Sequence, residues 1–64
     1  MIMNKVKERR ENLGMSQEEL AAKSGVSRTI ISQIETNQKT DVKLSTLFAL
    51  CNALGKQFDE IFLL

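Results

Sequence analysis

The sequence has no proline, histidine, tryptophan or tyrosine, and it has a single cysteine, Cys51. Without histidine, a zinc site of the usual ligand set is excluded, and one cysteine cannot form a disulfide within the chain. A lone cysteine and the lack of a signal peptide predict a reducing, cytoplasmic location. Apolar runs such as residues 61–64 are far too short to cross a bilayer, so no membrane partner is expected.

The chain is 64 residues long, and its composition predicts a single domain, residues 1–64, of the all-α class. A domain of this size buries only about 60% of the surface of its unfolded chain, so its core is small. The lack of proline and the presence of three glycines favour regular structure, and the apolar residues recur at helical spacing. A net charge of +1 does not by itself mark a nucleic-acid binder.

Residues with catalytic potential are few. Histidine is absent, no cysteine–base pair is visible, and no carboxylate pair belongs to an evident pocket. Glu18 and Glu19 open a predicted helix, where the helix dipole favours negative charge, so they are interpreted as structural. The sequence therefore predicts no enzyme, no metal site and no cofactor.

Residues 16–35 carry the strongest local pattern in the chain, and they predict two short helices joined by a tight turn. Ser16 can cap the first of these helices, and Glu19, three residues later, completes a capping box. Gly25 supplies a position where the backbone can take positive φ, and Ser27 can cap the second helix.

The second of these helices, predicted over about residues 28–36, has an apolar side and a polar side. Ile31 and Ile34 form the apolar side at i, i+3 spacing. The polar side consists of residues that can donate or accept hydrogen bonds: Arg28, Thr29, Ser32 and Gln33. Such a face is often merely solvated, but on a supported helix it becomes a candidate binding surface.

A first helix is predicted over residues 2–13. Ile2, Val6 and Leu13 lie on one face of it, and Gly14 supplies the left-handed residue that ends it. Met15 then packs in front of the next helix, which is predicted over about residues 17–23.

Two further helices are predicted over about residues 44–54 and 57–62, after a polar loop at residues 37–43. The fourth helix has an apolar face: Leu44, Leu47, Leu50, Cys51 and Leu54. Cys51 is interpreted there as a small buried hydrophobe. The fifth helix can complete the core of one chain with Phe58, Ile61 and Phe62.

The spacing of these motifs resembles that of the Cro/lambda-repressor-like, or XRE-type, helix-turn-helix family. The matching features are Arg10, Ser16-Gln17, Leu20-Ala21, Gly25-Val26, Ser27-Arg28-Thr29, Ile31, Gln33-Ile34-Glu35, residues 44–55 and the phrase QFDEIF. The resemblance covers essentially the whole chain, and it implies a compact five-helix bundle whose third helix enters the major groove of double-stranded DNA. A groove about 12 Å wide accepts one helix, and the N-terminal residues of that helix face the base edges.

Base contacts are expected from the polar side of the third helix. Arg28 can donate two hydrogen bonds to guanine O6 and N7, and Gln33 can pair with adenine in the same bidentate way. Thr29 and Ser32 can hydrogen-bond several bases, and the Thr29 methyl can contact a thymine methyl.

Phosphate contacts are implied first for Gln17, which matches the glutamine that opens the second helix in family members. The backbone N–H groups at that position also lie at the positive end of a helix dipole. The resemblance implies further phosphate contacts in or beside the loop after the third helix, from Asn37, Lys39 and Lys43. Ser27 is interpreted first as a helix cap and second as a phosphate contact.

Arg10 and Glu35 are interpreted as structural residues. Family members pair these two positions in a partly buried salt bridge between the first and third helices, and the resemblance implies the same pair here. Breaking such a pair costs about 3–5 kcal/mol, because it leaves an uncompensated buried charge.

Two leucines remain at the end of the chain once the fifth helix has completed the core. An apolar group of this kind often marks an interface, so Ile61, Leu63 and Leu64 are assigned to a homodimer contact. Two recognition helices about 34 Å apart would then read a palindromic operator. The alternative is a frayed apolar tail with no partner.

The resulting prediction is a sequence-specific DNA-binding transcriptional regulator, such as an autoregulating repressor, that binds as a homodimer. The chain leaves no room for a ligand-sensing domain, so no small-molecule ligand is expected. The alternative is an antitoxin-like or other interaction module, in which a partner protein covers an apolar face.

Overall fold

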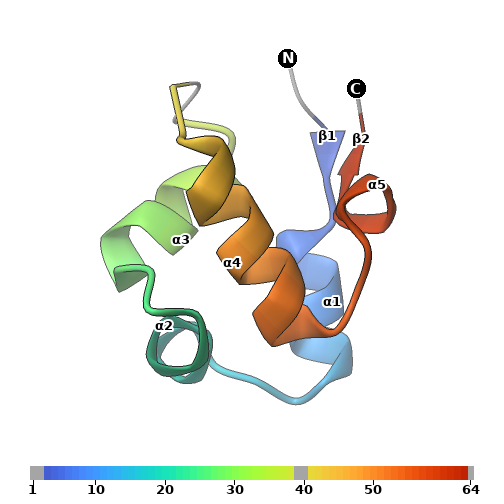
Figure 1. Ribbon diagram of the computed structural model, residues 1–64. Helices are drawn as coiled ribbons and strands as arrows, with labels where there is room; N and C mark the ends of the chain where they lie inside the picture. The colour runs from blue at the N-terminus through green and yellow to red at the C-terminus, as the bar shows by residue number, and fades with distance from the viewer. Residues whose placement is uncertain (1–2, 39–40, 64) are drawn as a thin grey trace.

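The computed structural model describes residues 3–38 and 41–63, and five helices form its body (Figure 1). The helices are α1 (Val6–Asn12), α2 (Gln17–Ser24), α3 (Arg28–Glu35), α4 (Leu44–Leu54) and α5 (Phe58–Ile61). α4 lies between the others and packs against α2, α1 and α5. The expected all-α, five-helix architecture is confirmed.

Local signals explain where α2 and α3 begin. The Ser16 hydroxyl accepts a hydrogen bond from the Glu19 backbone N–H at 3.0 Å, and the Glu19 carboxylate accepts one from the Ser16 N–H at 3.0 Å. After α2, Gly25 takes a φ of +75°, a left-handed conformation that suits a residue without Cβ. The Ser27 hydroxyl then accepts a hydrogen bond from the Ile30 N–H at 3.2 Å, which caps α3.

A short antiparallel pairing joins the two ends of the described chain. β1 (Met3–Asn4) lies beside β2 (Phe62–Leu63), as Figure 1 shows. The Lys5 N–H extends this pairing by donating to the Ile61 carbonyl oxygen at 2.7 Å. The expected fifth helix is therefore too long at its end, because the chain is already extended after Ile61.

The expectation of a first helix over residues 2–13 is wrong at its start. The chain is extended at Asn4, and α1 begins only at Val6. The Asn4 side-chain oxygen accepts a hydrogen bond from the Val6 N–H at 3.2 Å, and this contact provides an acceptor for the first turn of α1. Ile2, which was placed on the apolar face of this helix, lies outside the described residues.

One hydrophobic core lies between the helices, and every helix contributes to it. Its buried members are Val6, Met15, Leu20, Ile31, Ile34, Leu47, Leu50, Cys51, Leu54, Ile61 and Phe62. No helix in the described ranges is both long enough and apolar enough to cross a membrane.

Two residues expected in this core lie at the surface. Leu44 is 59% exposed, because burial along α4 begins only one turn later, at Leu47. Leu13 is also exposed, because α1 ends before it and the chain turns away at Gly14.

Candidate nucleic-acid interface

The inner side of α3 is fixed by packing. Ile31 and Ile34 are buried in the core together with Leu20 of α2, and α3 contacts both α2 and α1. The opposite side of α3 therefore presents its side chains from a supported helix. α3 has eight residues, and a helix about 10–12 Å across with its side chains fits into a major groove about 12 Å wide.

The four residues expected to contact bases all lie on α3. Arg28 and Thr29 are exposed, and Ser32 and Gln33 are half-buried. Among the described residues, the side chains of Thr29, Ser32 and Gln33 have no hydrogen-bond partner. Their donors and acceptors are therefore available to a ligand.

Arg28 is held by two side chains of α2. Its Nε donates a hydrogen bond to Gln17 Oε1 at 3.4 Å, and its Nη1 donates to Glu18 Oε1 at 3.3 Å. The arginine side chain nevertheless stays 62% exposed. Because a guanidinium has five N–H donors, these two contacts leave donors for a further partner. Arg28 thus lies on the surface and is not folded into the core.

A partly buried ion pair joins the end of α3 to α1. Arg10 Nε donates to Glu35 Oε2 at 2.8 Å and Arg10 Nη2 donates to Glu35 Oε1 at 3.2 Å, so the pair is bidentate. Arg10 Nη1 also donates to the Met15 carbonyl oxygen at 2.8 Å. The Glu35 side chain is only 2% exposed, and its hydrogen bond raises the pKa of Arg10 above the ordinary arginine value. The salt bridge that the resemblance implied is present.

Gln17 connects this ion pair to the exposed arginine. Its Nε2 donates to Glu35 Oε1 at 3.0 Å, while its Oε1 accepts the hydrogen bond from Arg28. Both ends of the Gln17 amide are therefore engaged within the chain. One amide N–H and the backbone N–H at the start of α2 remain as donors for a phosphate.

The other residues expected to contact phosphates differ in their position and in their hydrogen bonds within the chain. Ser27 caps α3, and Lys43 is exposed immediately before α4. Asn37 follows α3 with a φ of +58°, and its Oδ1 accepts a hydrogen bond from Asn4 Nδ2 at 3.2 Å. Lys39 lies outside the described residues.

Two residues at this surface were missed by the sequence analysis. Asn4 Nδ2 also donates to the Ile34 carbonyl oxygen at 3.0 Å, and this hydrogen bond connects β1 to α3. The position of Asn4 just before a helix is a sequence signal that could have identified it, because asparagine is favoured at helix starts. Glu18 was assigned to the helix dipole alone, and its contact with Arg28 depends on how α2 packs against α3, for which the local sequence gives no signal.

Of the side chains expected at a dimer interface, only that of Ile61 is among those the structure describes. Ile61 is 1% exposed and belongs to the core of one chain, so its assignment to an interface is wrong. The residue is buried because the short α5 turns it inward. The Leu63 side chain and the whole of Leu64 lie outside the described part of the chain.

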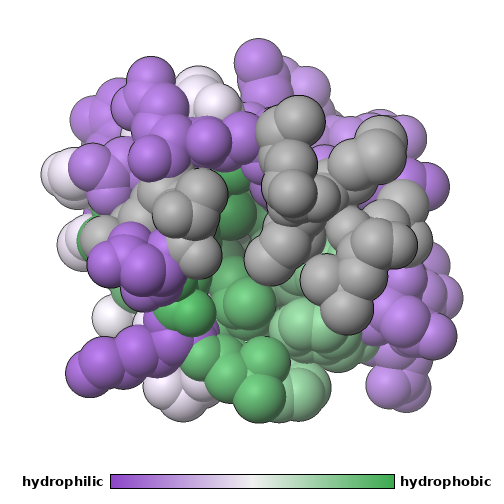
Figure 2. Space-filling model, turned by 90° about the horizontal axis from the view of Figure 1, so that it is seen from above, coloured by the Kyte–Doolittle hydropathy of each residue, from purple (hydrophilic) through white to green (hydrophobic). Residues whose placement is uncertain are grey.

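Exposed apolar residues occur instead on α4, beside an aromatic residue of α5. Leu44 and Phe48 are exposed, and the Phe48 ring centroid lies 5.1 Å from that of half-buried Phe58. The Phe58 ring centroid lies 5.2 Å from that of buried Phe62, so aromatic contacts run from the core to the surface. Figure 2 views the molecule from above the orientation of Figure 1, and it shows apolar side chains reaching the surface on this face. Leu44, Phe48 and Phe58 are called the α4–α5 surface below.

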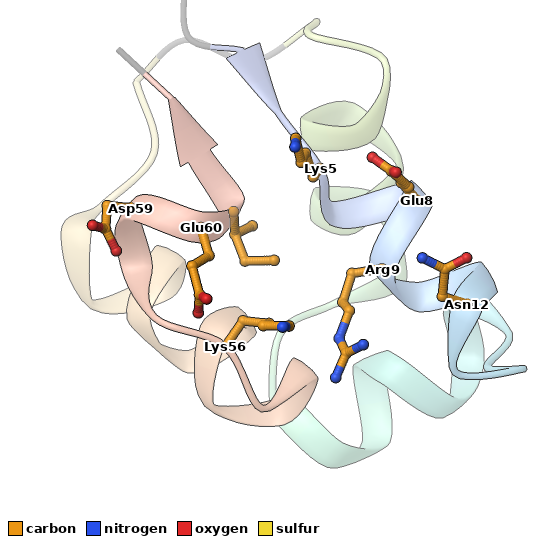
Figure 3. Close-up of a pocket in the computed structure, with 8 residues that line it drawn as sticks. Lys5, Glu8, Arg9, Asn12, Lys56, Asp59 and Glu60 are labelled. Carbon is orange, nitrogen blue, oxygen red and sulfur yellow. The ribbon is translucent and has the colours of Figure 1, made fainter.

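A hollow of about 410 Å³ lies between α1 and α5 (Figure 3). Its charged lining residues are of both signs: Lys5, Arg9 and Lys56, and Glu8, Asp59 and Glu60. The formal charges of these six side chains cancel, so the hollow offers no net field that would attract an anion. None of its lining residues comes from α2 or α3, and it is not part of the candidate interface.

The capped α2, the left-handed turn and the packed α3 define a helix-turn-helix domain. Comparison with protein families agrees, because the helix-turn-helix family model matches residues 6–61. The chain belongs to this helix-turn-helix family, and the matched range contains all of α2 and α3.

The chain is also similar to a bacterial protein. This relative is YgzD of Bacillus subtilis (strain 168), which is described as an uncharacterised HTH-type transcriptional regulator. The two are 41% identical over 61 residues, which cover 92% of this chain and 88% of the relative.

Proposed function

We propose that this protein is a sequence-specific DNA-binding transcriptional regulator that inserts α3 into the major groove. The observation that carries the proposal is the row of polar side chains on the outer side of α3, opposite Ile31 and Ile34 in the core. Membership of the helix-turn-helix family and the similarity to an HTH-type transcriptional regulator support it.

Base recognition is assigned to the four residues of this row: Arg28, Thr29, Ser32 and Gln33. Arg28 stands at the first position of α3 and donates in bidentate fashion to guanine. Gln33 pairs with adenine, and Thr29 and Ser32 contact neighbouring base edges. The exposure of Arg28 and the lack of intramolecular partners for the other three side chains among the described residues support these roles.

Backbone recognition is assigned to Gln17 and Ser27, at the starts of α2 and α3, and to Asn37, Lys39 and Lys43, which lie between α3 and α4 in the sequence. These groups contact phosphates, which position the domain but carry little sequence information. Loss of one lysine contact should weaken binding to every duplex alike and should reduce the salt dependence by about one unit of slope.

Selection from a pool of random duplexes, carried out with the full chain at two salt concentrations, tests the proposed function. The expected result is an enriched sequence that contains guanine and that persists at the higher salt concentration, because base contacts depend less on salt than phosphate contacts do. Retention of duplexes without any base preference at both salt concentrations would overturn it.

We further propose that the regulator acts as a homodimer through the α4–α5 surface. Leu44 and Phe48 expose apolar groups on it, and Phe58 connects them to the core. Exposed apolar residues that lie close together often mark an interaction site. A two-fold pair would place two copies of α3 about 34 Å apart, which suits a palindromic operator.

Sedimentation at micromolar concentration tests the dimer with a matched pair of variants. Leu44→Glu places a charge on the proposed interface at a helix start, where the dipole favours an acid, and should yield monomer. Leu13→Lys places a charge near the end of α1, where the dipole favours a base, and should leave the dimer intact. A wild-type chain that is monomeric both alone and on DNA would rule out the dimer.

The same surface supports a second candidate function. An antitoxin-like module would cover the α4–α5 surface with a different protein in place of a second copy. Capture of the product of an adjacent gene, lost in Leu44→Glu and retained in Leu13→Lys, would favour this function. Dimerisation of the isolated chain would count against it.

A further inference from the structure

We propose that Glu18 controls the selectivity of DNA binding by holding Arg28 in the unbound protein. The proposal rests on the function proposed above, in which Arg28 reads guanine. Glu18 acts as a positioning residue: it contacts the arginine, and the arginine contacts the base.

The geometry gives Arg28 two acceptors on α2 that differ in charge. Gln17 Oε1 lies 3.4 Å from Arg28 Nε, and Glu18 Oε1 lies 3.3 Å from Arg28 Nη1. Gln17 is fixed by its own hydrogen bond to Glu35, whose side chain is 2% exposed and is paired with Arg10. Glu18 is 77% exposed and forms no such second hydrogen bond with the residues that the structure describes, so it is the acceptor that can be exchanged.

Two neighbouring acids, Glu18 and Glu19, stand at the start of α2, and only Glu18 uses its carboxylate to hold Arg28. The Glu19 carboxylate accepts a hydrogen bond from the Ser16 N–H in the capping box. Its role is therefore to stabilise the helix start. Glu18 directs its carboxylate to Arg28.

The ion pair is too exposed to matter much for folding. Exposed pairs contribute little to stability, because water and salt screen both charges. The ion pair has its larger effect on DNA binding. The Glu18 carboxylate offsets the positive charge of Arg28, which would otherwise attract any phosphate. On a random duplex, Arg28 can gain only such a non-specific contact, and Glu18 competes with it directly.

Guanine changes this competition. It offers O6 and N7 together, so Arg28 can form two aligned hydrogen bonds that replace the single contact with Glu18. Glu18 therefore lowers the affinity for random DNA more than the affinity for the correct site. Specificity is a difference between two affinities, and a group that weakens the wrong complex increases it.

The test compares Glu18→Gln with Glu8→Gln in the full chain, on a selected duplex and on a random duplex. Glu8 lies on α1 and is exposed, so its substitution makes the same change in net charge away from α2 and α3. Glu18→Gln should bind the random duplex about two- to fivefold more tightly. Its salt slope there should steepen by up to about 0.9 unit, while its affinity for the selected duplex should change less.

Two further measurements separate this role from a merely structural one. The thermal midpoint of Glu18→Gln should match that of Glu8→Gln. In an Arg28→Ala background, Glu18→Gln should no longer change the ratio of the two affinities, because the residue acts through the arginine.

Each outcome decides between the proposals. If the wild type distinguishes the two duplexes but Glu18→Gln and Glu8→Gln have the same ratio of affinities, the role of Glu18 is overturned and the proposed function stands. If the wild type itself shows no base preference, both proposals are overturned.

Discussion

Arg10 is the residue on which the position of α3 depends most directly. Its guanidinium contacts Glu35 at the end of α3 and the Met15 carbonyl oxygen before α2, so one side chain joins α1 to both parts of the helix-turn-helix unit. Burial removes water from both charges, and the hydrogen bonds between them offset that loss. An apolar residue in place of either partner leaves the other charge buried and unpaired.

Arg10→Met should lower the free energy of unfolding by about 3–5 kcal/mol, because Glu35 then has no counter-charge. A domain of this size has a total of about 3–10 kcal/mol at 0.05–0.15 kcal/mol per residue, so much of the fold should be lost. Urea denaturation followed by circular dichroism measures the effect, with the exposed Lys7→Met on the same helix as control. An unchanged urea midpoint for Arg10→Met would show that the pair is not structural.

Cys51 should make the stability of the fold sensitive to alkaline pH. The residue is 3% exposed, and burial raises the pKa of its thiol. In the unfolded chain the thiol loses its proton above about pH 8.5, whereas the folded chain retains it. The free energy of unfolding therefore falls as the pH rises above that value.

The measurement for Cys51 is the urea midpoint at about pH 8 and about pH 10. The midpoint of the wild type should fall more than that of Cys51→Ala, which has no thiol to ionise. Comparing the two pH dependences removes the constant cost of the cavity that alanine leaves. Equal falls in the two proteins would contradict the burial of an un-ionised thiol.

At the scale of the element, the start of α2 shows how local chemistry fixes the helix-turn-helix unit. Ser16 and Glu19 each provide an acceptor for the backbone N–H of the other, which satisfies donors that the helix itself cannot. Gln17 and Glu18 are the first two residues after this cap. The cap therefore also fixes the position of the two side chains that contact Arg28.

Ser16→Ala should destabilise the domain by about 1 kcal/mol through loss of the cap. In a domain of this size the melting temperature should fall by roughly 4–8 °C. Ser45→Ala is the control, because Ser45 lies exposed near the start of α4 and caps nothing. If the two variants melted together, the capping box would have no energetic role.

Both ends of α2, the start of α3 and the end of α4 could be predicted, because their signals lie within a few residues of each end. Ser16, Gly25 and Gly55 mark such ends, and the structure has them there. The start of α1 and the end of α5 could not be predicted in the same way. Both depend on the pairing of β1 with β2, which come from opposite ends of the chain, and helical spacing contains no information about that pairing.

The candidate site was predictable to a similar depth. Helical spacing separates Ile31 and Ile34 from the polar row on α3, so the exposed row follows from the sequence alone. The contacts of Arg28 with Gln17 and Glu18 do not follow, because they depend on the distance between two packed helices. Leu44 was expected on the buried face of α4, but it is exposed, because the buried positions of this helix begin one turn later.

At the scale of the whole molecule, small size and weak charge limit how DNA can be recognised. The radius of gyration is 10.2 Å and the net charge is +1. A field this weak concentrates little DNA at the surface, so short-range base contacts must account for selectivity. Pairing of two copies through the α4–α5 surface would double those contacts on one operator.

In the proposed function, α3 is supported by the core and presents Arg28 to base edges. Binding of the wild type and of Arg28→Ala to a selected duplex and a random duplex, at one salt concentration, tests it most directly. Arg28→Ala should lose about 1–3 kcal/mol on the selected duplex, roughly 5- to 150-fold in affinity, and little on the random duplex. Lys43→Ala, a proposed phosphate contact, should instead weaken both complexes alike. Equal losses on the two duplexes for Arg28→Ala would contradict the claim.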